Sequence, residues 1–150
     1  MNQAKLLREN TRILECHLGN INKTDSCCCG ISEPECFVLV EIGRKPNISV
    51  KELAEILRLD KSGVSRTVEE LVQKDYVERK PSTEDRRFVV LNLTLKGKER
   101  FEKIENGMNR KFKEILDKIP VDKREQVIEA LELYNVACCE LERIKSGCLQ

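Results

Sequence analysis

The sequence predicts a mainly α-helical fold that contains one small β-hairpin. Apolar residues recur at helical spacing along most of the 150-residue chain, whereas β-prone runs flank a polar centre between residues 76 and 93. The composition, 40% hydrophobic and 35% charged, suffices for one compact core. We therefore expect a single domain over residues 1–150.

The N-terminal segment predicts an amphipathic helix over residues 3–19 that ends near Gly19-Asn20. Charges interrupt this segment, so it has no apolar core like that of a signal peptide. The sequence also has no run of about 18 apolar residues that could span a membrane. We therefore expect a cytoplasmic protein with no membrane partner. The apolar stripe of this helix consists of Leu6, Leu7, Ile13, Leu14 and Leu18.

Two capping boxes, residues 32–35 (Ser-Glu-Pro-Glu) and 49–52 (Ser-Val-Lys-Glu), predict two helix starts. The first box opens a short helix over residues 36–42 that Gly43 closes, and the second opens a helix of about two turns. Asp60 follows a tight turn and is a good N-cap for a third helix. Two short helices joined by such a turn have the outline of a helix-turn-helix. The third helix carries Val64, Val68, Leu71 and Val72 on one face.

The hydrophobic period changes after the third helix. Residues 76–80 and 88–93 are β-prone and flank the polar run 81–87, which predicts a hairpin with a long polar tip. Helix, turn, helix and hairpin in that order predict a winged helix-turn-helix over residues 32–94.

Two further helices are predicted after the hairpin. Thr94 can cap a long helix that Pro120 stops, and Asp122-x-x-Glu125 opens the last one. These helices expose more apolar surface than one small winged helix can cover. We therefore predict that residues 1–19 and 95–150 are dimerisation helices of a homodimer.

The start of the third helix carries candidate DNA-contacting residues. A recognition helix presents its N-terminal hydroxyl, amide and guanidinium groups to base edges in the major groove. Glu69 and Glu70 follow, so an ordinary solvated face is the alternative interpretation. The candidates are Lys61, Ser62, Ser65, Arg66 and Thr67, of which Arg66 is the best suited to guanine.

The wing tip offers the adjacent cations Arg86 and Arg87. An arginine can sense the negative potential of a narrow minor groove, and either residue could do so here. Asp85 is expected to orient Arg87 through a charge-assisted hydrogen bond instead of touching DNA. Because the whole chain has 27 basic and 26 acidic residues, a DNA-binding surface must come from such local segregation of charge.

Residues 85–94 (DRRFVVLNLT) resemble the D-x-R-x-x-x-L-x-L-T signature of the MarR family of bacterial regulators. Residues 53–55 and 64–72 look like that family's helix-turn-helix. The resemblance implies a homodimer that binds a palindromic operator and usually represses transcription until an effector releases it. The family usually has glycine near Asp75, so the Lys74-Asp75 pair departs from the pattern. The sequence therefore does not decide the backbone geometry of this turn.

Eight cysteines are expected to be reduced thiols, since neither the N-terminus nor the helical patterns suit a secreted disulfide scaffold. Cys27, Cys28 and Cys29 precede the second helix, Cys36 lies one turn inside it, and Cys16 could approach them. Thiolates near a helix N-terminus could hold a thiophilic metalloid such as arsenite, or zinc, or react with an oxidant. Three consecutive cysteines by themselves have a poor geometry for chelating a metal ion. The alternative is therefore that these thiols are bystanders that sense nothing.

The sequence thus predicts a sequence-specific DNA-binding regulator, a repressor released by an effector, and not an enzyme. A thiol oxidoreductase is the first alternative. It lacks support, because the chain has no Gly-rich phosphate loop and only one histidine as a base. A regulator that senses a small aromatic ligand and carries bystander cysteines is the second alternative. A thiolate-bound metal or metalloid is the one cofactor that the residues suggest.

Overall fold

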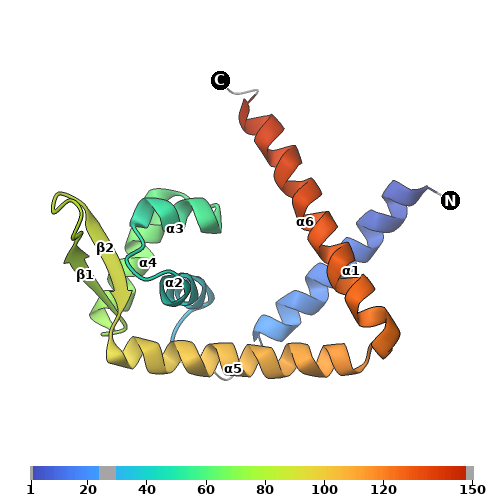
Figure 1. Cartoon of the computed structure of the whole chain (residues 1–150), viewed down its shortest axis with the longest axis horizontal. Coiled ribbons are helices and arrows are strands. Elements are labelled where there is room, and N and C mark those ends of the chain that lie inside the picture. Colours follow the sequence, from blue (N-terminus) through green and yellow to red (C-terminus); the bar gives the residue numbers. More distant parts are fainter. Residues whose placement is uncertain (1, 24–29, 148–150) are drawn as a thin grey trace. The chain divides into compact units, whose positions relative to one another are not determined.

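The computed structural model describes residues 2–23 and 30–147. These residues form six α-helices and one antiparallel hairpin, which confirms the mainly α-helical fold with a small β-hairpin wing (Figure 1). The elements are α1 (Gln3–Lys23), α2 (Glu33–Arg44), α3 (Val50–Leu57), α4 (Lys61–Gln73), β1 (Val77–Pro81), β2 (Val89–Leu93), α5 (Leu95–Asp117), the 3-10 turn η2 (Val121–Lys123) and α6 (Arg124–Gly147).

The chain divides into two compact units, residues 1–109 and 110–150. In the first unit, α2, α3 and α4 pack with the hairpin around one apolar core. Ile48, just before α3, pairs with Leu91 of β2 as an isolated antiparallel bridge and so joins the hairpin to the segment before α3. This core therefore holds the helix-turn-helix and the wing in one body. Its fully buried side chains include Leu39, Ile42, Ile48, Leu53, Leu71 and Leu91.

Four predicted caps are present at the helix starts. The Ser32, Ser49, Asp60 and Thr94 side chains each accept a hydrogen bond from the backbone N–H three residues later, over 2.8–3.3 Å. The α6 start differs from the prediction, because Asp122 lies inside η2 and α6 begins at Arg124. The first turn there is closed by the backbone bond from Lys123 N to Pro120 O, so Asp122 is not needed as a cap.

Two glycines predicted to end helices lie inside them instead. Helix α1 continues through Gly19 to Lys23, since one glycine inside a helix costs only about 1 kcal/mol. Helix α2 runs through Gly43 to Arg44. A Cβ on Gly43 would lie 2.5 Å from Cδ2 of Phe101, so this glycine admits the Phe101 ring of α5. The prediction that Gly43 closes its helix was therefore wrong.

The turn from α4 to β1 passes through Asp75 with a φ of 64°, in the left-handed region. This is the turn in which the sequence resemblance led us to expect glycine. The Asp75 carbonyl accepts a hydrogen bond from Thr94 Oγ1 over 2.6 Å. An aspartate therefore adopts here the backbone conformation that glycine adopts with less strain.

Gly97 of α5 lies where that helix meets the entry to the wing. A Cβ at this position would lie 2.0 Å from the Tyr76 carbonyl oxygen, which already accepts from Thr94 N. We predict that Gly97→Ala destabilises the fold by about 1–3 kcal/mol, the usual cost of overpacking, measured by urea denaturation. Gly19→Ala is the control, because nothing lies within 4 Å of its added methyl. Equal unfolding midpoints for the two variants would contradict the prediction.

Candidate nucleic-acid interface

Helix α4 has one buried face and one exposed polar face. Val64, Val68 and Leu71 are buried in the core, and this fixes the opposite side toward solvent. Asp60 caps this helix, so the helix starts at a defined residue and the side chains of its first two turns have defined positions. The exposed side chains of these turns include Lys61, Ser62, Ser65 and Arg66, while Thr67 is half-buried.

Two of the candidate hydroxyls make local hydrogen bonds at the start of α4. Ser62 Oγ donates to Asp60 Oδ2 over 2.7 Å, and this bond lowers the pKa of Asp60 most, ahead of the bond from Gly63 N. The stabilisation by the ionised cap is therefore present above the unfolded pKa of Asp60 and is lost as the pH falls through the lowered folded value. Thr67 Oγ1 donates to Gly63 O over 3.1 Å. Lys61, Ser65 and Arg66 are also exposed, and Lys61 and Arg66 have the longest side chains among the candidates.

The wing tip is closed by backbone hydrogen bonds and one ion pair. Phe88 N donates to Asp85 O over 3.0 Å, and Ser82 N donates to Phe88 O over 2.8 Å. Arg87 donates to the Asp85 carboxylate from its backbone N over 3.1 Å, from Nε over 3.1 and 3.2 Å and from Nη2 over 2.7 Å. This pairing lowers the pKa of Asp85 and raises that of Arg87. Arg86 is exposed beside it.

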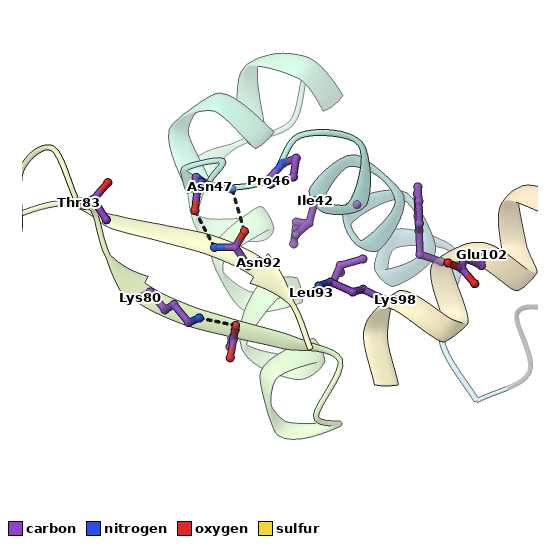
Figure 2. A pocket seen from close by; sticks show the side chains of 12 residues that line it. Ile42, Pro46, Asn47, Lys80, Thr83, Asn92, Leu93, Lys98 and Glu102 are labelled. Carbon is purple, nitrogen blue, oxygen red and sulfur yellow. Dashed lines mark hydrogen bonds and ion pairs between the residues drawn. The ribbon is translucent and has the colours of Figure 1, made fainter. Parts of the chain in front are cut away.

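One link between the wing and the helix-turn-helix was not predicted from the sequence. Asn47, before α3, and Asn92, on β2, exchange two hydrogen bonds: Asn47 N donates to Asn92 Oδ1 over 3.0 Å, and Asn92 Nδ2 donates to Asn47 Oδ1 over 2.9 Å (Figure 2). Asn47 has a φ of 64°. Asparagine after Lys45-Pro46 is a turn signal, because its side chain tolerates this conformation. Nothing in the sequence identified Asn92 as its partner.

The same face of the hairpin borders a hollow of about 620 Å³ (Figure 2). Its wall includes Asn47, Asn92, Leu93 and Phe101. Glu78 and Lys80 of β1 pair with each other at its edge, over 3.0 Å.

The structure places the cysteines only in part. Cys27, Cys28 and Cys29 lie outside the described residues. Cys16 is exposed on α1 and Cys36 is half-buried on α2. Among residues 2–23 and 30–147, no group of three or more His, Cys, Asp or Glu side chains could hold a metal ion. The predicted thiolate site therefore stays a prediction.

Large apolar side chains remain exposed on α1 and, in the second unit, on α6. Such surface marks an interaction site when it is contiguous. No described helix is both long enough and apolar enough to cross a membrane. The exposed residues include Leu6, Leu7, Ile13, Leu14 and Leu18 of α1, and Val127, Ile128, Leu131, Leu133, Val136 and Leu141 of α6.

A helix-turn-helix joined through one core to an arginine-bearing wing is the architecture of a winged-helix transcriptional regulator. A family model described as the MarR family matches residues 30–87. The HTH-type transcriptional regulator BilQ of Clostridium symbiosum (strain WAL-14163) is 32% identical over 103 residues, which cover 69% of this chain and 72% of BilQ. The HTH-type transcriptional repressor MdtR of Bacillus subtilis (strain 168) is 32% identical over 78 residues, which cover 52% of this chain and 50% of MdtR. This chain belongs to the MarR family.

Solved structures agree with this assignment. A MarR/EmrR family regulator from Acinetobacter sp. ADP1 is 25% identical, with a TM-score of 0.72 and coverage of 93% of this chain and 99% of that one. Streptococcus pneumoniae FabT in complex with DNA has the same fold, with a TM-score of 0.79 at 22% identity and coverage of 93% and 99%. The protein is a DNA-binding transcriptional regulator and not an enzyme. The thiol oxidoreductase alternative is set aside.

Proposed function

We propose that two copies of this chain form a cytoplasmic homodimer that binds a palindromic double-stranded operator and represses transcription until an effector releases it. The observation that carries the proposal is that the exposed start of α4 and the Arg86-Arg87 tip belong to one packed body. The repressor name of MdtR and the DNA in the FabT complex support it. Residues 32–94 read DNA within a single domain 1–150, and residues 1–19 and 95–150 supply the dimer contacts.

Each candidate residue has a defined task in this proposal. Arg66 pairs with a guanine edge in the major groove, and its neighbours on α4 contact bases or phosphates. One wing arginine enters the minor groove, while Asp85 holds Arg87 in place. The neighbours are Lys61, Ser62, Ser65 and Thr67.

Selection of random-sequence DNA on the purified protein tests the proposal. Sequencing of the retained duplexes is expected to yield an inverted repeat, with half-site centres about 10 bp or a multiple of it apart, as two-fold symmetry requires. Retention of duplexes without a shared sequence would contradict sequence-specific binding. A shared sequence without inverted symmetry would contradict a symmetric homodimer.

We further propose that the thiols of Cys27, Cys28, Cys29 and Cys36, with Cys16 as a candidate, sense the effector. A ligand releases DNA only if it binds the released conformation better, and a shift from 1:99 to 99:1 takes roughly 5.5 kcal/mol of differential affinity. Several metal–thiolate bonds can supply that difference.

Arsenite, zinc and peroxide are therefore each titrated into the DNA complexes of the wild type and of Cys28→Ser/Cys29→Ser/Cys36→Ser. We expect at least one of them to release only the wild type, measured by mobility shift. Identical release curves for both proteins would make the cysteines bystanders. In that case a small aromatic ligand becomes the effector class to test.

A further inference from the structure

The hairpin needs support from the helical body if its tip is to hold a fixed position. A two-stranded hairpin alone is marginally stable in water. The ladder between β1 and β2 ends at the pair Pro81–Val89, so the residues beyond it, including Arg86 and Arg87, depend on how the ladder is held.

Three polar contacts among the described residues join the hairpin to the segment 47–73. Leu91 N donates to Ile48 O over 2.8 Å, and Arg79 Nη2 pairs with Glu69 Oε2 over 2.6 Å. The third is the reciprocal Asn47–Asn92 pair, which we call the asparagine clasp. The Arg79–Glu69 pair is an exposed ion pair between long side chains and holds geometry weakly. The clasp has two hydrogen bonds between short side chains and backbone, so it restrains direction as well as distance.

We infer that the asparagine clasp is a positioning device that holds the wing at the angle at which its arginines meet DNA. Asn92 lies five residues after Arg87 along the hairpin, so the lever is at most roughly 16 Å long at the usual rise per strand residue. A swing of about 10° would move the tip by roughly 3 Å, enough to break an arginine contact in a groove. Asn47 and Asn92 then act on DNA binding without touching DNA.

The local conformation at Asn47 fits this task. Its left-handed φ of 64° turns its amide N–H and its side chain together toward Asn92. The bridge from Leu91 to the next residue, Ile48, fixes the register of the clasp. Both clasp bonds are exposed, so their loss should cost little global stability. The base of the hairpin would stay in the core, while the direction of the wing would be held less closely.

The inference rests on the proposed contact between wing and DNA. A double-mutant cycle distinguishes a failure of the clasp inference from a failure of that contact. The probe is a duplex recovered by selection on the wild-type protein, with binding measured at fixed salt. Asn92→Ala is expected to weaken binding about fivefold, or on the order of 1 kcal/mol, in the wild-type background. In the Arg66→Ala background the factor stays about fivefold. In the Arg86→Ala/Arg87→Ala background it falls to almost none, because there is no wing contact left to misplace.

Asn47→Gly tests the clasp from its other side, since glycine accepts the left-handed backbone and removes the side chain that bears the Oδ1 acceptor, while the bond from its backbone N to Asn92 Oδ1 can remain. Asn47→Gly should show the same dependence on background. It therefore keeps the inference testable if Asn92→Ala folds poorly. Val90→Ala, on the same face of β2, is the control and should bind as wild type. Equal losses in all three backgrounds, or no loss at all, would overturn the inference while leaving the wing contact intact. If Arg86→Ala/Arg87→Ala itself binds as wild type, the proposed wing contact fails, and the inference fails with it.

Discussion

The Leu14→Glu/Leu131→Glu variant is expected to be monomeric and to bind selected DNA about 10²–10⁴ times more weakly than the wild type. Both leucines lie on exposed apolar faces, one on α1 and one on α6. Glutamates buried in the proposed dimer interface would have no partner, and desolvating unpaired charges is costly. A monomer reads one half-site and loses the gain in avidity that linking two reading heads provides.

Sedimentation equilibrium at micromolar concentration checks the first half of this prediction, and a binding titration checks the second. Leu133→Glu is the matched control, since Leu133 is 72% exposed and points about 200° away from Leu131 around α6. It should remain dimeric and bind DNA. A dimeric double variant with full affinity would remove α1 and α6 from the interface.

Arg66→Ala is expected to weaken specific binding by about 1–3 kcal/mol, which is roughly 5- to 150-fold. The loss should be concentrated at one base pair of each half-site, because a bidentate contact to guanine discriminates among bases. Arg87→Ala should also weaken binding and leave the major-groove preference unchanged. Titrations of the selected duplex and of single-base variants at fixed salt measure both effects.

Lys103→Ala removes an exposed cation from α5 and is the control for net charge. It should bind with wild-type affinity at the same ionic strength. If Arg66→Ala and Lys103→Ala behave alike, Arg66 contributes only to the general potential of the protein. Its assignment as a base-reading residue would then be wrong.

The sequence predicted most of the fold because its signals are local. Each of the caps at Ser32, Ser49, Asp60 and Thr94 joins residues three positions apart, so spacing alone reveals them. The hairpin and the buried face of α4 also follow from short-range periodicity. The order of these local signals along the chain predicted the winged helix-turn-helix, and the resemblance at residues 85–94 agreed with it.

Two of the predictions that failed depend on contacts distant in sequence. Gly43 lies inside its helix, and the Phe101 ring of α5 occupies the space that a side chain at Gly43 would need. Glu35 does not complete its capping box, since its buried carboxylate pairs with Lys74 over 2.7 Å. Local rules assign both residues to helix ends and contain no information on these partners.

The candidate site shows the same division between local and distant contacts. The Asp85–Arg87 pair spans two residues and was predictable, as was the solvent exposure of Arg66. The bond from Thr67 to Gly63 is a common i−4 contact of threonine in helices and could have been foreseen. The Asn47–Asn92 clasp joins residues 45 positions apart, and only the folded structure reveals it.

Chemical footprinting of the selected duplex tests most directly the claim that α4 and the wing read DNA as a symmetric pair. The wild-type protein should protect major-groove guanine N7 atoms in two half-sites related by a two-fold axis, with protected minor-groove adenine N3 atoms flanking them. Arg86→Ala/Arg87→Ala should lose only the minor-groove protection, and Arg66→Ala should expose one guanine in each half-site. A single asymmetric footprint, or an unchanged footprint in both variants, would contradict the account.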